Sequence, residues 1–328
     1  MSNQKGSADE VTLQEDEQKP LFVTDEELLS FWDDPTVVGG INFPPHYKPM
    51  THIVPIYDKM KTGFINEEAF TIMKVVGDGI ATNEEQIKRF FLTKNLTRTE
   101  VSNHINRLRE KGFLDRWHLR SDVSEHVYPN LSAPITLGMS GFILLKHFYK
   151  EQFFMDSMLW DRLGIHTIQR YIAANELRCQ IYESRTLRKW VWNGLVANNT
   201  KISRPFGTAV LSTPNGDMKF VFERVHQGKK YLTHLTKRIN QWGELIEDNN
   251  GTLPVANTEE LRTIVVVYVS TRSLAEHIVE ELALFNVKFM IWICIEEDLI
   301  KFGIEHSFYI PEKHKLKPVK MAFLAPKR

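Results

Sequence analysis

The feature that most constrains the fold is a helix within residues 96–112 whose two ends are both marked. Thr97 and Glu100 have the spacing of a capping box, in which the hydroxyl accepts a backbone N–H and the carboxylate reaches back to the cap residue. Gly112 can adopt the left-handed conformation that commonly follows the last turn of a helix. These signals predict a helix that begins at about Arg98 and ends just before Gly112.

The two faces of this predicted helix differ in chemistry. Val101, Ile105 and Leu108 recur at helical spacing and predict one buried stripe. The opposite face carries short polar side chains interleaved with arginine, which suits hydrogen bonding to base edges and phosphates. An ordinary solvated helix can also look like this, so the flanking segments must decide. The candidate DNA contacts on the helix are Arg98, Thr99, Ser102, Asn103, Asn106, Arg107 and Arg109.

The flanking segments predict a winged helix-turn-helix, in which two helices precede the recognition helix and a β-hairpin wing follows it. The expected elements are helices at 67–76 and 82–91, the second with its own capping box from Thr82, and strands at 113–120, 127–128 and 135–137 around a polar tip at 121–126. The first wing strand adds three candidate contacts to phosphate or to the minor groove, Arg116, His118 and Arg120.

Residues 99–114, TEVSNHINRLREKGFL, resemble the third helix and wing of winged-helix transcription regulators of the MarR type. The resemblance implies binding to double-stranded DNA. The charge distribution agrees, although the formal net charge of the chain is zero. Residues 1–34 carry ten acidic residues and two lysines, whereas residues 86–120 carry nine basic residues and three acidic ones. The predicted reading surface is therefore locally basic, as counterion release from DNA requires.

Length and composition indicate a two-domain protein. A chain of 328 residues is too long for a winged helix alone, which takes roughly a hundred residues. No apolar run approaches the roughly 20 residues that span a bilayer, and the first residues do not form a secretory signal, so we expect a cytoplasmic protein with no membrane contact. Cys179 and Cys294 lie far apart and predict neither a disulfide nor a zinc site. No metal or cofactor is expected.

Four segments are expected in chain order. Residues 1–20 should be a disordered acidic tail, and residues 21–63 an irregular Pro- and Gly-rich arm with a short helix at 24–32, which could dock on the body or on a partner protein. Residues 64–150 should form the winged helix-turn-helix domain, including a helix at 139–149 for dimerisation or for the core. Residues 151–328 should form an α/β domain.

Strand signals dominate this last segment. After a helix at 160–182, strands are expected at 190–192, 208–212 and 218–223, with a hairpin turn at 214–217, and a helix follows at 230–246. The runs 263–270 and 288–294 are continuously apolar and are separated by a helix at 273–285. Continuous apolar runs predict strands that are covered on both faces and joined by a helical crossover.

The order of these elements resembles the restriction-endonuclease-like core. In that family a Pro-Asp begins one strand and a Glu-x-Lys ends the next, because carboxylates hold a divalent metal and the lysine assists the attacking water. Glu223 matches the glutamate, but Phe206 and Val225 stand where the aspartate and the lysine would be. We therefore predict a degenerate, inactive core. His226 and His234 are interpreted as ordinary polar surface rather than metal ligands.

With the winged helix in front, the layout resembles the replication-relaxation family of plasmid and mobile-element proteins. The matching segments are PITLGMSGFILL at 134–145, ANELR at 174–178 and FVFERVHQG at 220–228. The resemblance implies a DNA-binding role in plasmid replication or transfer or in its regulation. Symmetric DNA sites favour a homodimer, because two modules that read two half-sites add their contact energies. Two alternatives stay open: a metal-dependent nuclease that uses Glu223 with other carboxylates such as Asp217 or Glu183, and a regulator whose α/β domain senses a small ligand.

Overall fold

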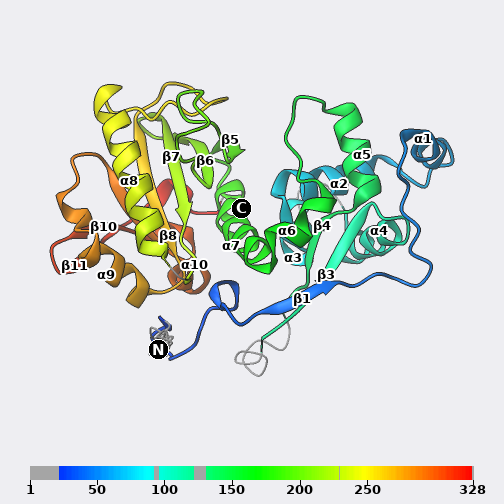
Figure 1. The fold of residues 1–328 in the computed structure, drawn as a ribbon, viewed down its shortest axis with the longest axis horizontal. Helices are drawn as coiled ribbons and strands as arrows, with labels where there is room; N and C mark the ends of the chain where they lie inside the picture. The colour runs from blue at the N-terminus through cyan, green and yellow to red at the C-terminus, as the bar shows by residue number, and fades with distance from the viewer. Residues whose placement is uncertain (1–21, 92–95, 122–130, 229, 327–328) are drawn as a thin grey trace, which may run out of the picture.

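A computed structural model of the chain describes residues 22–91, 96–121, 131–228 and 230–326. It is a mixed α/β protein with two sheets, and the long helix α7 stands between the two halves (Figure 1). The predicted acidic tail, most of the wing tip and the strand at 127–128 lie outside the described residues. No described helix has the length and apolar character to cross a membrane.

The first half contains short elements from the N-terminal side and a helical core. In chain order these are η1 (Phe31–Asp33), β1 (Val38–Ile41), α1 (Ile53–Lys61), α2 (Glu67–Gly79), β2 (Ala81–Asn83), α3 (Glu84–Phe91), α4 (Arg98–Glu110), β3 (Leu114–Arg120), β4 (Pro134–Leu137) and α5 (Met139–Phe148). The sheet has the order β1-β3-β4-β2 and is antiparallel throughout. Residues 114–116 of β3 pair with β4, whereas residues 117–120 pair with β1.

The core of this half lies between the helices and the sheet. Val101, Ile105 and Leu108 of α4 are at most 1% exposed and join a cluster that also includes residues of α2, α3, α5 and the strands. The predicted stripe on α4 is therefore confirmed. Because this stripe is fixed in the core, the opposite face of α4 must point outward.

The second half contains a seven-stranded mixed sheet in the order β11-β10-β9-β8-β7-β6-β5. Its elements are η2 (Ser157–Leu159), α6 (Trp160–Leu163), α7 (Ile165–Glu183), β5 (Leu187–Trp192), β6 (Gly207–Thr213), β7 (Gly216–Arg224), α8 (Tyr231–Asp248), β8 (Thr263–Val269), α9 (Arg272–Glu281), η3 (Leu284–Asn286), β9 (Ile291–Ile295), α10 (Glu296–Phe302), η4 (Ile304–His306), β10 (Phe308–Glu312), β11 (Lys315–Val319) and η5 (Ala322–Leu324). Strands β7, β8 and β9 are parallel, and the other pairs are antiparallel.

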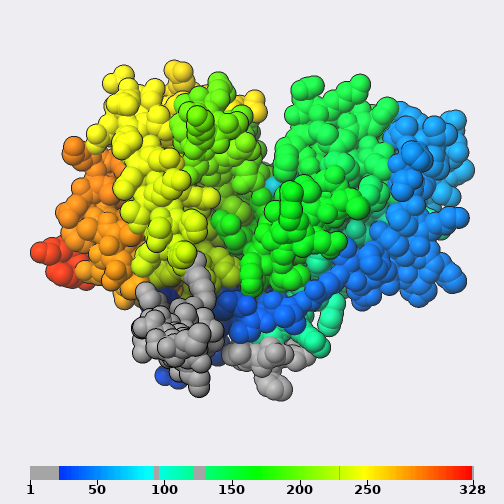
Figure 2. Space-filling model, in the orientation of Figure 1, coloured from blue at the N-terminus to red at the C-terminus, as the bar shows by residue number. Residues whose placement is uncertain are grey.

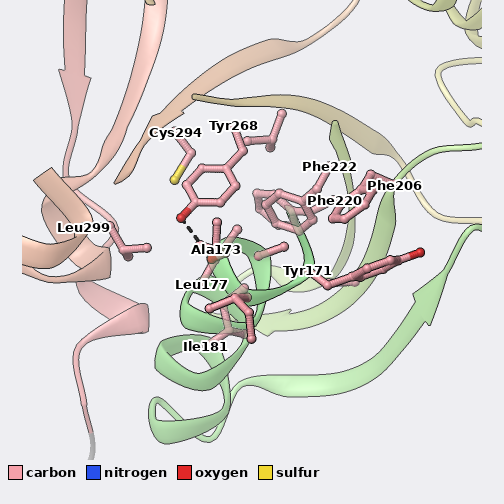
Figure 3. Packing of buried hydrophobic residues seen from close by; sticks show 14 of the residues in the cluster. Tyr171, Ala173, Leu177, Ile181, Phe206, Phe220, Phe222, Tyr268, Cys294 and Leu299 are labelled. Carbon is pink, nitrogen blue, oxygen red and sulfur yellow. Dashed lines mark hydrogen bonds between the residues drawn. The ribbon is translucent and has the colours of Figure 1, made fainter. Parts of the chain in front are cut away.

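Both faces of the parallel strands are covered, as the apolar runs predicted. One face packs against α7, whose Leu177 belongs to the same buried cluster as Phe220 and Tyr268 of the sheet (Figure 3). The Tyr268 hydroxyl donates to the Ala173 carbonyl at 3.1 Å. The other face packs against α8 and α9, around the fully buried Trp242. Both cysteine side chains, Cys179 and Cys294, are free thiols buried in the core.

Several local predictions were wrong. Residues 24–32 do not form a helix, and the only helical turn there is η1. The arm 33–63 is not wholly irregular, since it contains β1 and α1. The helix expected at 160–182 is interrupted at Gly164, whose φ of 74° ends α6 and precedes α7. The sequence also gave no prediction for α10, β10 and β11.

The second capping box is shifted by one residue. Thr82 is buried in β2 opposite Ile135, so its hydroxyl does not cap α3. Asn83 takes this role: the Gln86 amide donates to Asn83 Oδ1 at 2.9 Å, and the Asn83 amide donates to Gln86 Oε1 at 3.1 Å. Pairing in the sheet therefore decided which of two adjacent polar residues became the cap.

Residues 22–41, which we call the N-terminal strap, connect the two halves. The strap runs in blue along one edge of the molecule (Figures 1 and 2). At one end Gln227 exchanges hydrogen bonds with the backbone of Phe22, at 2.7 and 2.9 Å. At the other end Asp34 accepts from the Ser121 hydroxyl, and β1 pairs with β3. The strap thus joins the carboxyl end of the parallel strands to the end of β3 that leads into the predicted wing tip.

Candidate nucleic-acid interface

The N-terminus of α4 is fixed by the predicted capping box. The Thr97 amide donates to Glu100 Oε2 at 2.8 Å, and the Glu100 amide donates to Thr97 Oγ1 at 3.2 Å. These bonds from the Thr97 backbone and hydroxyl lower the pKa of Glu100, so its carboxylate stays ionised beside the positive end of the helix dipole. The start of α4 is therefore well defined, which fixes the direction of its exposed side chains.

Three of the predicted contacts form an exposed polar stripe on α4. Thr99, Asn103 and Asn106 follow one another at intervals of four and three residues, and all three are exposed. Within the described part of the chain, Thr99 and Asn103 make no side-chain hydrogen bond or ion pair, and Asn106 only accepts from Arg109 Nη1 at 3.5 Å. These groups are available to a partner outside the chain.

Two further predicted contacts are occupied by acidic residues of α3. The Ser102 hydroxyl donates to Glu84 Oε1 at 2.5 Å, and Arg98 is ion-paired with Glu85. Burial would raise the pKa of Glu84, but hydrogen bonds from Lys88 and Ser102 lower it, so Glu84 remains an acceptor. Ser102 therefore holds α4 against α3. Arg98, whose side chain is 54% exposed, can leave its exposed pair at little cost.

Arg107 and Arg109 are held against the protein. The Arg107 guanidinium lies over the Phe64 ring at 5.2 Å, and its Nη2 is 3.2 Å from His104 Nδ1. Arg109 Nη2 donates to the Asn42 carbonyl at 3.0 Å, just beyond β1. The sequence could not show these contacts because Phe64 and Asn42 are distant in the chain.

The first strand of the hairpin places its three predicted contacts differently. Arg116 is 3.9 Å from Glu84, and its side chain is 34% exposed. His118 and Arg120 are exposed and lie opposite Gly40 and Val38 of β1. In the described part of the chain Arg120 has no ion pair. Strand β1 can approach β3 this closely because Gly39 has no Cβ. A Cβ at this position would lie 2.1 Å from the His118 carbonyl oxygen.

The second region of interest is the edge of the large sheet where β7, β8 and β9 end. Glu223 is buried there and is ion-paired with Arg238 of α8, and Arg170 of α7 lies 3.6 Å away. Burial raises the pKa of Glu223, and the two arginines oppose this shift. Both guanidinium groups would repel a divalent cation at this position.

The other positions of the nuclease-like motif are apolar and packed. Phe206 lies under the Arg170 guanidinium at 4.7 Å, and Val225 belongs to the core on the α8 side. The carboxylates named for the nuclease alternative lie elsewhere. Glu183 binds Arg89 at 2.6 Å, and Asp217 is six residues from Glu223 along β7, which is roughly 20 Å. The described residues contain no group of three or more His, Cys, Asp or Glu that could hold a metal ion.

Next to Glu223 lies a buried polar network, to which the strap contributes the carboxylate of Asp33. Arg224 pairs with Glu296 at 2.5 Å, and both side chains are almost fully buried. Asp33 of the strap accepts from the Ser270 hydroxyl at 2.5 Å and from the Gln227 amide at 2.7 Å. His226 lies 3.8 Å from Asp33, but burial lowers its pKa to about 4.

No motif in the sequence indicated this network, because its members come from segments far apart in the chain. His226 is therefore a partly buried, neutral side chain near pH 7, which corrects its interpretation as ordinary polar surface. His234, in contrast, is exposed on α8. Carboxyl edges of parallel strands often bind ligands, but here the chain's own strap lies across the edge.

Comparisons of the chain with protein-family models, with curated proteins and with solved structures gave no match.

Proposed function

We propose that this protein binds double-stranded DNA sequence-specifically, with α4 in the major groove and the β3–β4 hairpin beside it. The observation that carries the proposal is the exposed stripe of Thr99, Asn103 and Asn106 on a helix whose opposite face is fixed in the core. Thr99 and Asn103 have no internal polar partner among the described residues, and Asn106 has only Arg109, so these hydroxyl and amide groups are well suited to hydrogen bonds with base edges.

The arrangement of the first half supports a winged helix-turn-helix. Its elements follow the order α2-β2-α3-α4-β3-β4, and β2, β4 and β3 are adjacent antiparallel strands. In winged helices the third helix enters the major groove while the wing contacts the backbone or the minor groove. Arg98 of α4 and Arg116 and Arg120 of β3 would contact phosphates.

We further propose a non-catalytic role for the second half in assembly, with the protein acting as a homodimer on plasmid or mobile-element DNA in replication, transfer or transcription regulation. The order α7-β5-β6-β7-α8-β8 supports a nuclease-like origin. The pairing of Glu223 with Arg238 and Arg170 favours structure over metal-assisted hydrolysis. A dimer would place two α4 helices on two half-sites, which adds their contact energies.

The experiment is selection of DNA duplexes from a randomised library by the full-length protein, followed by affinity measurements on the selected and a scrambled duplex. The double variant Asn103→Ala, Asn106→Ala should lose about 2–6 kcal/mol of binding to the selected duplex, since each amide contact contributes about 1–3 kcal/mol. Its melting temperature should not change, because both side chains are exposed. Equal wild-type affinity for selected and scrambled DNA would contradict the proposal.

Incubation of supercoiled plasmid with the protein and Mg²⁺ or Mn²⁺ separates this function from the nuclease alternative. We expect binding without nicking. Metal-dependent cleavage by the wild type that disappears in Glu223→Ala would instead establish a nuclease.

One observation favours the ligand-sensing alternative. A cavity of about 280 Å³ lies between the strap and the distal part of the β3–β4 hairpin, with Trp32, Trp117 and Arg120 among its lining residues. This is slightly below the roughly 300–1,000 Å³ of typical small-molecule sites, so we place this function second. A rise in melting temperature with a small molecule, absent in Trp32→Ala, would support it.

A further inference from the structure

We propose that α4 reads adenine, and that its target contains neighbouring A·T pairs contacted by Asn103 and Asn106. This inference rests on the proposed DNA-binding function and names the base that the site recognises. Asparagine suits adenine because its amide can accept from the N6 amino group while donating to N7. Arginine and lysine instead suit guanine, which presents two acceptors in the major groove.

The arginines of α4 are poorly placed to read guanine. Arg107 lies on Phe64 at 5.2 Å, and Arg109 donates to the Asn42 carbonyl at 3.0 Å. Arg98 is the most exposed of the three, but it lies in the first turn of α4 beside Glu85 of α3, where a phosphate contact is expected. The groups left on the outward face are amides and a hydroxyl, which shifts the predicted specificity from G·C to A·T.

The side chain of Asn106 is also oriented by a hydrogen bond from Arg109, on the same helix. Arg109 is anchored on the Asn42 carbonyl and directs Nη1 towards Asn106 Oδ1 at 3.5 Å. A carbonyl oxygen has two acceptor sites, so Oδ1 keeps one for the adenine amino group, and the Nδ2 group stays free for N7. Arg109 is therefore a positioning residue for the amide rather than a contact to the base.

The spacing along α4 indicates how many base pairs are read. Asn103 and Asn106 are three residues apart, about 4.5 Å along the helix axis, and Thr99 lies about 6 Å before Asn103. Because base pairs are about 3.4 Å apart, the two amides should contact adjacent or next-adjacent pairs. The Thr99 methyl group would then lie near a third pair, where contact with a thymine methyl is favourable.

The test uses the library-selected duplex and a panel in which each base pair of the motif is replaced in turn. The wild type should prefer A·T at two neighbouring positions by about 10-fold or more each. Asn103→Ala should abolish the preference at one of them and Asn106→Ala at the other. Asn103→Arg should convert the first position to G·C, because arginine matches the two guanine acceptors.

Two controls make the outcome specific. Asn240→Ala removes another exposed asparagine, from α8, and should leave every preference unchanged. Arg109→Ala should weaken the preference at the Asn106 position and not at the Asn103 position, which a loss of general charge would not do.

The possible failures are distinguishable. If the wild type selects a motif but the motif is G·C at the positions that respond to Asn103 and Asn106, or if neither substitution changes any position, the adenine inference is wrong and DNA binding stands. If no duplex is preferred over scrambled DNA, the proposed function itself fails.

Discussion

The outward face of α4 and the carboxyl edge of the parallel strands are both rich in charged and polar groups, but these groups have different partners. At the sheet edge, Arg224, Glu296 and Asp33 are buried and bind one another or nearby backbone. On α4, Asn103 and Thr99 are exposed and make no polar contact among the described residues. Under the proposed function, the side chains of α4 that lack internal partners are the ones that contact DNA.

The energetic consequences of the two arrangements are opposite. Removing one member of a buried ion pair leaves an uncompensated charge in a low-dielectric interior, which is strongly destabilising. Removing an exposed polar side chain costs the fold little, and its effect should be seen only when the partner is present. Stability and DNA affinity should therefore respond to separate sets of substitutions.

The largest effect is expected at the sheet edge. Glu296→Ala leaves the Arg224 guanidinium, which is 0% exposed, without its carboxylate. We expect a loss of about 3–5 kcal/mol in the free energy of unfolding, measured by urea denaturation of the full-length protein. Glu247→Ala is the matched control, since its pair with Lys288 is exposed, and should cost less than about 1 kcal/mol. Similar losses in the two variants would remove the contrast between the regions.

His226 should make the stability depend on pH. Burial lowers its folded pKa from an ordinary 6.5 to about 4, so the unfolded chain binds a proton that the folded chain rejects. Its stabilising contribution is complete above about pH 6.5 and falls as the pH decreases towards 4, by up to about 3 kcal/mol.

Urea denaturation between pH 4 and 7 tests this effect. His226→Asn should flatten the pH dependence in this window, whereas His234→Asn, on the exposed surface of α8, should not. An unchanged slope in the His226 variant would show that other groups dominate the acid response.

Local signals predicted the parts of the fold that depend on neighbouring residues. The capping box and buried stripe of α4 follow from spacing within one helix, and the strands β8 and β9 follow from apolar runs. The short helix predicted at 24–32 did not form, although the Leu28 amide does donate to Thr24 Oγ1 at 3.1 Å. The strap is instead held in a non-helical path by its hydrogen bonds to the large sheet, from Phe22 to Gln227 and from Ser270 to Asp33.

The candidate site was predicted only in part, for the same reason. Helical spacing places Thr99, Asn103 and Asn106 on the outward face, and the structure agrees. Whether an arginine is free depends on residues distant in the chain, such as Phe64 beside Arg107. The pairing of Glu223 with Arg170 and Arg238 likewise needs three separate elements, and no motif records it.

The smallest effect on DNA binding is expected for the arginines of the hairpin. Here the difference between a side chain with an internal partner and one without can be tested within one strand. Arg116 and Arg120 both lie on β3, but Arg116 is 3.9 Å from Glu84, whereas Arg120 has no ion pair within the described residues. Under the proposed function, Arg120→Ala should weaken binding to all DNA sequences alike and reduce the slope of log affinity against log salt by about 1, the value for one phosphate contact. Arg116→Ala should reduce it less, because Glu84 already neutralises part of its charge. Binding measured across a salt series decides: equal reductions would mean that Arg116 leaves Glu84 when DNA binds, and an unchanged slope in both variants would mean that β3 does not contact the backbone.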